Sequence, residues 1–391
     1  MRIAYFTHIN FRGTRAHVHN TLKTVEAISQ AGAQISLISN DDPLTESTVK
    51  EIKDHHDIRV PFEMVFLKIA PFAETIHPSR WRRTLTLLKI NFLFTKYLIV
   101  HRNEIDVVYY RFHLISLPAF VWHFVFGKCV IFESHYVYIY NWLAQALTWF
   151  SVRFADGVVC ITDALRVHYN LLKEKSIVTP CHASESELVP TTSLIDLRKQ
   201  LDLPLQSNIL CYTGSLGRTI QGISYEVETL VDILPALPES YISVIVGVRD
   251  ERDADTLRLR AKQAGVNHRV ILRPWTDRSI VMSYLGAADI LLMPRVGTAP
   301  GSSPSKMFDY LAMKKPIIAA STPPVNEILH HEDNALLINA DQPQQWIEAI
   351  RRLIDHPELA KSISEKAEKD AHSYTWEIRG RKIFDFIRNL L

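Results

Sequence analysis

The chain has 391 residues, of which 47% are hydrophobic and 22% charged, and its formal net charge is +2. This balance is typical of a globular protein and excludes a disordered or fibrous chain, while the length favours two or three domains. The near-neutral charge and the lack of a nucleic-acid-binding motif argue against a nucleic-acid partner. The four cysteines are far apart and form no Cys-x-x-Cys pair, so we expect reduced thiols in a cytoplasmic protein.

The first half of the chain begins with a βαβ pattern. We expect a strand at Ile3–Phe6, a helix at His17–Gln30 that stops at Gly32, and a strand at Gln34–Ser39. Further apolar runs at 105–110, 128–132 and 157–161 are separated by helix-length segments. This spacing predicts a doubly wound parallel sheet in a first, Rossmann-like domain over residues 1–185.

A basic region lies inside this first domain. Residues 77–128 hold eight Lys and Arg against two acidic residues, Glu104 and Asp106. Arg80, Arg82 and Arg83 precede a leucine-rich run, which is typical of a helix that lies on an anionic membrane. A helix packed on its own domain with solvated arginines explains the pattern equally well. No apolar run reaches the roughly 18 uncharged residues that a membrane span needs.

A change of composition at residues 186–207 predicts a linker, after which a second α/β domain runs from 208 to 375. Strands are expected at 208–212, 243–246, 270–272, 290–293 and 317–319, with helices at Glu226–Leu237, 253–264, 278–286 and 305–313 between them. Three helices then close the chain, the last over 376–391. Two Rossmann-like domains in series therefore make up the predicted fold.

Two loops of the second domain follow strands and lead toward helix N-termini, where parallel sheets bind anions. The loop at 213–222 holds three glycines and Arg218, and the loop at 294–305 leads into Lys306. Glycines let the backbone approach a phosphate closely, and the cations and helix amides favour a diphosphate. Ser305 is expected to cap the helix, with Ser302 and Ser303 beside it.

Asp309, one turn into that helix, suits hydrogen bonds from ribose hydroxyls better than phosphate binding. The alternative is an aspartate that is merely exposed to solvent near a helix start.

Residues 303–319 resemble the donor-site signature of the family 4 glycosyltransferases of GT-B fold, also called glycosyl transferases group 1. The resemblance extends to 212–216, 287–294, 334–338 and 374–376. It implies two Rossmann-like domains that face each other across a cleft, with the last helix crossing back to the first domain. It also implies a retaining transferase of the hexosyltransferase type, with no cofactor and no essential metal.

The same resemblance implies a UDP- or GDP-sugar donor and a glycan or lipid-linked acceptor, in surface polysaccharide biosynthesis on the cytoplasmic face. His135, Arg218 and Lys306 are the predicted catalytic residues. The predicted donor-binding residues are Gly13, Gly214, Arg218, Arg273, Trp275, Arg295, Ser302, Ser303, Ser305, Lys306 and Asp309. Acceptor-side candidates are Arg15, Arg111 and Glu133.

Two positions depart from the family pattern. Gln221 stands where many members have a lysine, and Ser302 stands where the first of two acids seven residues apart is expected. Two alternatives stay open. One is a nucleotide-sugar 2-epimerase of the same architecture, and the other is a non-catalytic relative that binds a nucleotide or a partner protein.

Overall fold

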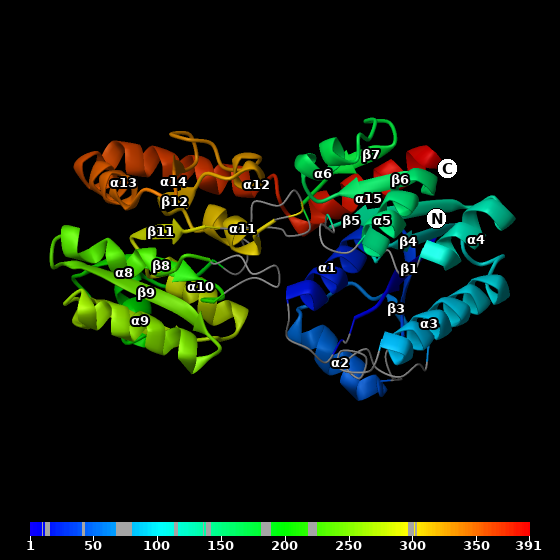
Figure 1. The fold of residues 1–391 in the computed structure, drawn as a ribbon, viewed down its shortest axis with the longest axis horizontal. Helices are drawn as coiled ribbons and strands as arrows, with labels where there is room; N and C mark the ends of the chain where they lie inside the picture. The colour runs from blue at the N-terminus through cyan, green and yellow to red at the C-terminus, as the bar shows by residue number, and fades with distance from the viewer. Residues whose placement is uncertain are drawn as a thin grey trace. The chain divides into compact units, whose positions relative to one another are not determined.

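The computed structural model describes residues 1–9, 11, 16–40, 44–67, 80–112, 116–135, 137, 142–180, 189–217, 225–295, 301 and 303–391, without the side chains of 16 and 80–84. The chain divides into two compact units (Figure 1). The first holds residues 1–181 and 376–391, and the second holds residues 182–375. Helix α7 (Leu194–Gln200), which lies in the segment predicted as linker, packs within the second unit against α10 (Arg278–Gly286).

The first unit is a seven-stranded parallel sheet covered by helices on both faces. Its strand order is β3-β2-β1-β4-β5-β6-β7, and every described pair is parallel. The strands are β1 (Arg2–Thr7), β2 (Gln34–Ser39), β3 (Glu63–Phe66), β4 (Val107–Tyr110), β5 (Cys129–Ser134), β6 (Gly157–Cys160) and β7 (Ser176–Val178). Side chains that alternate along β1 and β4 enter two separate apolar cores, one on each face.

Different helices cover the two faces of this sheet. The core of one face includes residues of α3 (Arg80–Val100), α4 (Ser116–Phe126), α5 (Trp142–Phe154) and α6 (Asp163–His168). The core of the other face includes residues of α1 (Ala16–Gln30), α2 (Glu46–His55) and the C-terminal α15 (Trp376–Leu390). Gly380 of α15 lies so close to α1 that an added Cβ would sit 2.3 Å from the carbonyl oxygen of Ala27. The end of the chain is thus part of the first unit.

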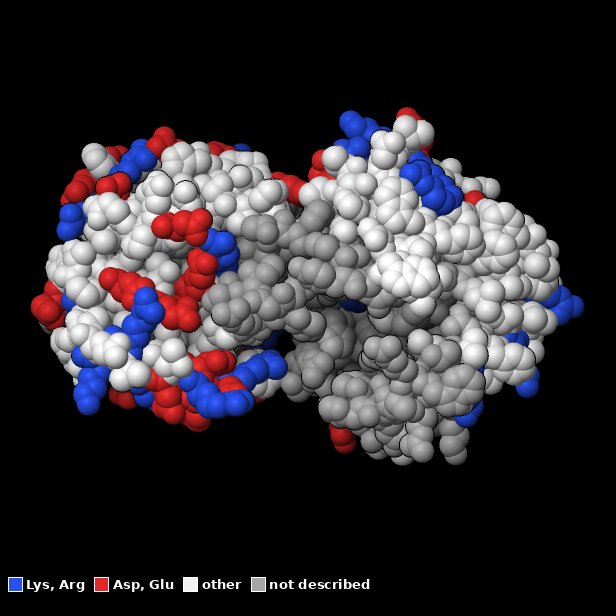
Figure 2. Space-filling view, in the orientation of Figure 1, with Lys and Arg blue, Asp and Glu red and all other residues white. Residues whose placement is uncertain are grey.

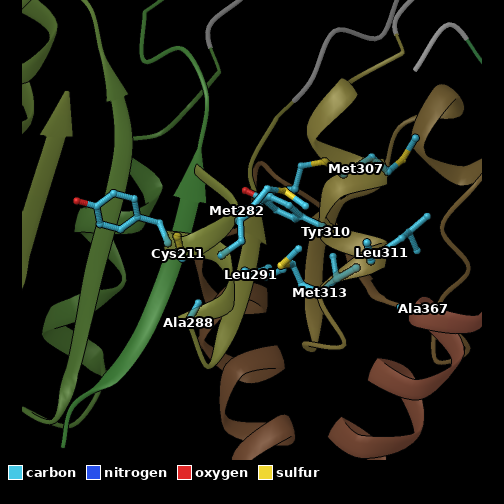
Figure 3. Packing of buried hydrophobic residues seen from close by; sticks show 14 of the residues in the cluster. Cys211, Met282, Ala288, Leu291, Met307, Tyr310, Leu311, Met313 and Ala367 are labelled. Carbon is cyan, nitrogen blue, oxygen red and sulfur yellow. The ribbon is translucent and has the colours of Figure 1, made fainter. Parts of the chain in front are cut away.

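The second unit repeats the plan with six parallel strands in the order β10-β9-β8-β11-β12-β13. The strands are β8 (Asn208–Thr213), β9 (Tyr241–Val248), β10 (Val270–Pro274), β11 (Ile290–Met293), β12 (Ile317–Ala320) and β13 (Leu336–Ile338). Its helices are α7, α8 (Thr229–Asp232), α9 (Glu251–Gln263), α10, α11 (Ser305–Ala312), α12 (Pro323–Asn326), α13 (Pro343–Asp355) and α14 (Pro357–Ala371). Figure 3 shows Met307, Tyr310 and Leu311 of α11 packed between β8, β11 and α14.

Both sheets have the doubly wound strand order, which confirms the predicted fold class. In detail, the helix expected at Glu226–Leu237 is wrong: α8 is a single turn, followed by a 3₁₀ turn at Leu234–Ala236. Pro235 explains the break, because proline removes a backbone N–H and crowds the preceding turn. Cys129, Cys160 and Cys211 are buried free thiols, and Cys181 lies outside the described residues.

Within the part of the chain that the structure describes, no helix is both long and apolar enough to cross a membrane.

Candidate functional site

The strand order of the second unit defines a switch point next to β8. From β8 the chain continues to β9 and β10 on one side of β8, and it then returns to β11 on the other side. The connections that follow the neighbouring strands β8 and β11 therefore lead away in opposite directions. Ligands of doubly wound sheets bind at such a switch point, beyond the carboxyl ends of the strands. Here β8 ends at Thr213 before Gly214, and the chain after β11 continues to α11. Tyr310 connects β8 and β11 through hydrogen bonds. Its hydroxyl accepts a hydrogen bond from the Thr213 amide at 3.1 Å and donates one to the Leu292 carbonyl.

Lys306 brings a cation from α11 to the end of β8. Its ammonium lies 3.8 Å from the ring centre of Tyr212 and 5.5 Å from that of Tyr225, a favourable cation–π arrangement. Desolvation lowers the pKa of Lys306 to about 7. Among the described residues no carboxylate forms an ion pair with it. An anion bound here would gain from the ammonium and from the free amides at the start of α11.

Two glycines make room for this lysine. An added Cβ on Gly214 would lie 2.5 Å from Lys306 Nζ, and the φ of Gly214 is +138°. Gly247, at the end of β9, has a φ of +129°, and a Cβ there would lie 2.2 Å from the Gly214 carbonyl oxygen. Because both residues have a φ that L residues rarely adopt, and a Cβ on Gly247 would meet backbone, the backbone of 214 is fixed directly beside the ammonium.

Asp309 is buried and paired, so its exposure to solvent, the alternative considered from the sequence, is wrong. Its Oδ1 accepts from Arg278 Nη2 of α10 at 2.5 Å. Ser305 is also not the helix cap: α11 begins at Ser305, its N-cap residue is Pro304, and no side chain caps it. A carboxylate that already accepts from a guanidinium has further lone pairs, so Asp309 can also accept a hydrogen bond from a hydroxyl group.

Two arginines of the predicted donor site, Arg273 and Arg295, have partners within the unit. Arg273 donates to the backbone carbonyls of Leu201 and Asp202 at 3.2 and 3.0 Å, beyond the end of α7. Arg295 forms ion pairs with Glu226, at 2.8 Å, and with Asp341. Both therefore position loops of the unit in this structure.

Trp275 follows β10 and is 40% exposed, with the Arg249 guanidinium 4.7 Å from its ring centre. Ser303 and Ser305 lie at the start of α11, while Gly13, Arg15, Arg218 and Ser302 lie outside the described residues.

A second polar cluster lies at the carboxyl end of β5 in the first unit and centres on Glu133, which is 1% exposed. Its Oε1 accepts from Arg379 Nη2 at 2.8 Å and lies 2.7 Å from His135 Nε2, while Oε2 accepts from the Tyr109 hydroxyl. Burial would raise the pKa of Glu133, but the charge of Arg379 and the hydrogen bond from His135 outweigh it and hold that pKa well below its usual value. Glu133 is therefore a buried, ionised carboxylate.

His135 is neutral in this environment. Burial and the positive charge of Arg111 lower the pKa of His135 to about 4, against the opposing effect of Glu133. Because an ionised Glu133 only accepts hydrogen bonds, His135 Nε2 must carry the proton and donate it. The lone pair of Nδ1 is then the acceptor of this ring.

Arg111, at the end of β4, belongs to the same cluster. Its Nη1 donates to the Thr21 hydroxyl of α1 at 2.6 Å, and its charge acts on Tyr5, Glu133 and His135. The structure thus brings Arg111 together with Glu133 and His135, which the sequence analysis had chosen from two different strand ends.

The sequence analysis missed several residues that hold these sites. Arg379 sits on the last helix, far along the chain from Glu133, and also donates to the Thr179 carbonyl at 2.8 Å. Arg278 binds Asp309, and the rings of Tyr212 and Tyr225 flank Lys306. Only Tyr212 had a signal, because it adjoins the glycine loop. No group of His, Cys, Asp or Glu among the described residues is arranged to hold a metal ion.

Comparison with known proteins agrees with this picture. Residues 195–370 match the family model of glycosyl transferases group 1, so the second unit carries a domain of this family, which confirms the resemblance predicted from residues 303–319. A D-inositol 3-phosphate glycosyltransferase of Corynebacterium urealyticum is 23% identical over 248 residues, which cover 60% of this chain and 57% of that protein. The chain spans about half the length of the curated relatives it matches.

Solved structures identify the fold as GT-B. The HepE protein of Anabaena in complex with UDP has a TM-score of 0.75 at 15% identity, and each chain is covered completely. A UDP-GlcNAc 2-epimerase of Neisseria meningitidis, bound to UDP-GlcNAc, has a TM-score of 0.64 at 13% identity, again over both whole chains. Since transferases and an epimerase share this architecture, the fold alone does not choose between the two activities.

Proposed function

We propose that this protein is a retaining hexosyltransferase that moves a sugar from a UDP- or GDP-sugar to a glycan or lipid-linked acceptor during surface polysaccharide biosynthesis. The observation that carries the donor part is the ammonium of Lys306, desolvated beside Gly214 with no acidic partner among the described residues. A desolvated cation at a switch point is stabilised by an incoming anion, and a diphosphate brings two charges to it. The matching family model and the UDP complex of a structural neighbour support the same ligand class.

In this function the second unit neutralises the leaving diphosphate. Lys306 and Arg218 would supply the charge that offsets the developing negative charge as the bond from sugar to phosphate breaks. No metal is needed for that step. Asp309 would accept from a ribose hydroxyl while Arg278 fixes its orientation, and Trp275 would offer its ring to the base.

The cluster around Glu133 would act on the sugar or the acceptor. Glu133 and Arg379 fix the His135 ring, and the Nδ1 lone pair would accept a hydrogen bond from a sugar hydroxyl. Arg111 adds positive charge at the same strand ends, which suits an anionic or hydroxyl-rich acceptor. Because His135 is neutral, its contribution is orientation and hydrogen bonding and does not depend on its being protonated near pH 7.

Calorimetric titration of the full chain with UDP, GDP and ADP, with and without Mg²⁺, tests the donor site. We expect one nucleotide to bind at micromolar strength without metal, and Lys306→Ala to weaken binding at least tenfold. Lys314→Ala is the matched control, because Lys314 is exposed near the other end of α11. If no nucleotide binds, or if the two variants behave alike, the donor site is not at Lys306.

Product analysis distinguishes the proposed transferase from the epimerase and from the non-catalytic alternative. Incubation with UDP-GlcNAc alone should leave the sugar unchanged, whereas a 2-epimerase would invert the configuration at its C2. Incubation with a lipid-linked acceptor and the donor should give turnover that His135→Ala reduces while nucleotide affinity stays unchanged. Nucleotide binding with no turnover on any acceptor would favour the non-catalytic alternative.

A further inference from the structure

The outer side of three neighbouring helices in the first unit is unusually apolar. Helix α3 lies beside α4, and α4 lies beside α5. Their exposed side chains include Leu88 and Phe92 of α3, Phe124 and Val125 of α4, and Trp142 and Phe150 of α5. Trp142 is 78% exposed, Phe92 is 68% exposed and Phe124 is 57% exposed. We call this surface the α3–α5 face.

The outer side of α5 is apolar. Trp142, Ala146 and Phe150 are exposed at intervals of four residues, so one apolar stripe faces outward. The buried side is mixed, because Val152 and Phe154 belong to the apolar core while Thr148 and Ser151 are buried as well. A surface helix in water normally places its polar residues outward, so this pattern indicates a non-aqueous environment outside α5.

The apolar surface continues from α5 to α4. The ring centres of Phe120 and Phe150 are 5.4 Å apart, and those of Phe120 and Phe124 are 4.5 Å apart. In Figure 2 the part of this unit where α4 and α5 lie in Figure 1 is mostly white, with blue groups apart from one another. The exposed side chains therefore form a surface that spans helices.

The charges on these helices have one sign. α3, α4 and α5 contain no aspartate or glutamate, and the exposed charges that the structure describes on them are Lys89, Lys96 and Arg153. Arg80, Arg82 and Arg83 begin α3, and their side chains lie outside the described residues. By contrast, α9 of the second unit carries acidic and basic residues in its first two turns.

We propose that the α3–α5 face binds the surface of an anionic lipid bilayer. Aromatic and aliphatic side chains would enter the headgroup region, while the lysines and arginines contact lipid phosphates. A second copy of this chain fits less well, because a symmetric contact would bring basic residues against basic residues. The described helices do not span a membrane, so the unit would lie on its surface. Membrane binding would place the first unit beside a lipid-linked acceptor and in this respect rests on the proposed function.

Flotation of the full chain with vesicles tests this surface directly. We expect binding to phosphatidylcholine vesicles that contain about one third phosphatidylglycerol, and little binding to phosphatidylcholine alone. Phe92→Glu combined with Trp142→Glu should reduce binding to the anionic vesicles more than tenfold, since each change places a charge in the apolar contact. Leu259→Glu is the matched control, because Leu259 is similarly exposed, at 58%, on α9 of the second unit.

Lys89→Glu combined with Lys96→Glu tests the electrostatic part and should remove the preference for anionic lipid. An unchanged unfolding temperature of the first unit, which contains the substituted residues, would show that each variant is folded. The proposal would be overturned if the wild-type protein did not bind anionic vesicles, or if the double variants bound them as the wild type does. Capture of a protein by this face without vesicle binding would also overturn it. A protein that binds vesicles but no nucleotide would refute the proposed donor site and leave the membrane surface standing.

Discussion

Glu133 keeps its charge inside the first unit because Arg379 supplies the opposite one. Both side chains are almost completely buried, and the guanidinium also donates to the carbonyls of Thr179 and Pro180 and to the Thr24 hydroxyl. A buried ion pair is a weak source of net stability, but removing one partner leaves an uncompensated charge. Arg379 is thus the residue on which the geometry of His135 depends.

We expect Arg379→Met to lower the free energy of unfolding of the first unit by about 3–5 kcal/mol, the usual cost of breaking a buried pair from one side. Arg381→Met is the control, since Arg381 is exposed two residues further along α15 and pairs weakly with Glu377. Urea denaturation of both variants measures the difference. Equal stabilities would show that the Glu133–Arg379 pair does not act as a unit.

Lys306 predicts a pH dependence of nucleotide affinity. Its pKa is about 7 in the free protein, and a bound diphosphate would raise that pKa, so binding above pH 7 requires proton uptake. Affinity should therefore fall between pH 7 and 9, by at most about tenfold per pH unit, and should lose this dependence below pH 7. The range avoids the ionisation of the nucleotide's own terminal phosphate, which has a pKa of roughly 6.

Calorimetry in two buffers of different ionisation enthalpy would detect the proton uptake at pH 8. Lys306→Arg supplies the control, because a guanidinium stays protonated throughout and should bind without the pH dependence. Affinity that is constant from pH 7 to 9 in the wild type would contradict a titrating lysine at the phosphate site.

At the scale of elements, the docking of α15 depends on a residue without a side chain. Gly380→Ala should destabilise the first unit by about 1–3 kcal/mol, because the new methyl group would overlap the Ala27 carbonyl, which is backbone and cannot rotate away. The better helix propensity of alanine, worth about 1 kcal/mol, acts in the opposite direction but is smaller than such a clash. Lys382→Ala, on the exposed side of α15, should have little effect.

Hydrogen exchange of the α15 amides, together with urea denaturation, would measure this effect. Faster exchange confined to α15 in the Gly380 variant would indicate that the helix separates before the rest of the unit. Unchanged exchange and stability would mean that α1 can move aside at no cost.

The order of the elements was predictable from the sequence, since apolar runs at helix-length spacing specify a doubly wound sheet. The boundaries of the elements were harder to predict. Pro235 shortens the predicted helix at Glu226–Leu237, and the three-residue strands β7 and β13 are too short to show an alternating pattern of apolar residues. The environment of α5 was also unpredictable, because a run such as Trp142–Phe154 does not show which side meets the sheet.

The candidate site was predictable where it follows strand ends or begins a helix. Glu133, His135 and Gly214 lie at strand ends and Lys306 lies at the start of α11, whereas Arg379 reaches its partner through folding of distant segments. Asp309 was identified from its place on α11, but its partner Arg278 lies on another helix and carries no local signal. Pairings of this kind depend on tertiary geometry, which one sequence does not contain.

For the whole molecule, the division into two units predicts that ligand binding and unfolding are local. Each unit has its own sheet and its own pair of apolar cores, and Lys306 lies in the second unit. A nucleotide at about one hundred times its Kd should stabilise the unit that binds it by about 2.7 kcal/mol. For a unit of this size that corresponds to a rise of roughly 5–10 °C in the unfolding temperature.

Scanning calorimetry of the full chain should therefore resolve two transitions, of which the nucleotide raises only one. Arg379→Met should lower the other transition, because its partners lie in the first unit. The two perturbations together assign each transition without cutting the chain, and the Lys306→Ala variant should remove the nucleotide shift while leaving both transitions in place. A single transition that responds to nucleotide and to Arg379→Met alike would contradict independent units and would mean that the donor site and the Glu133 cluster unfold as one cooperative body.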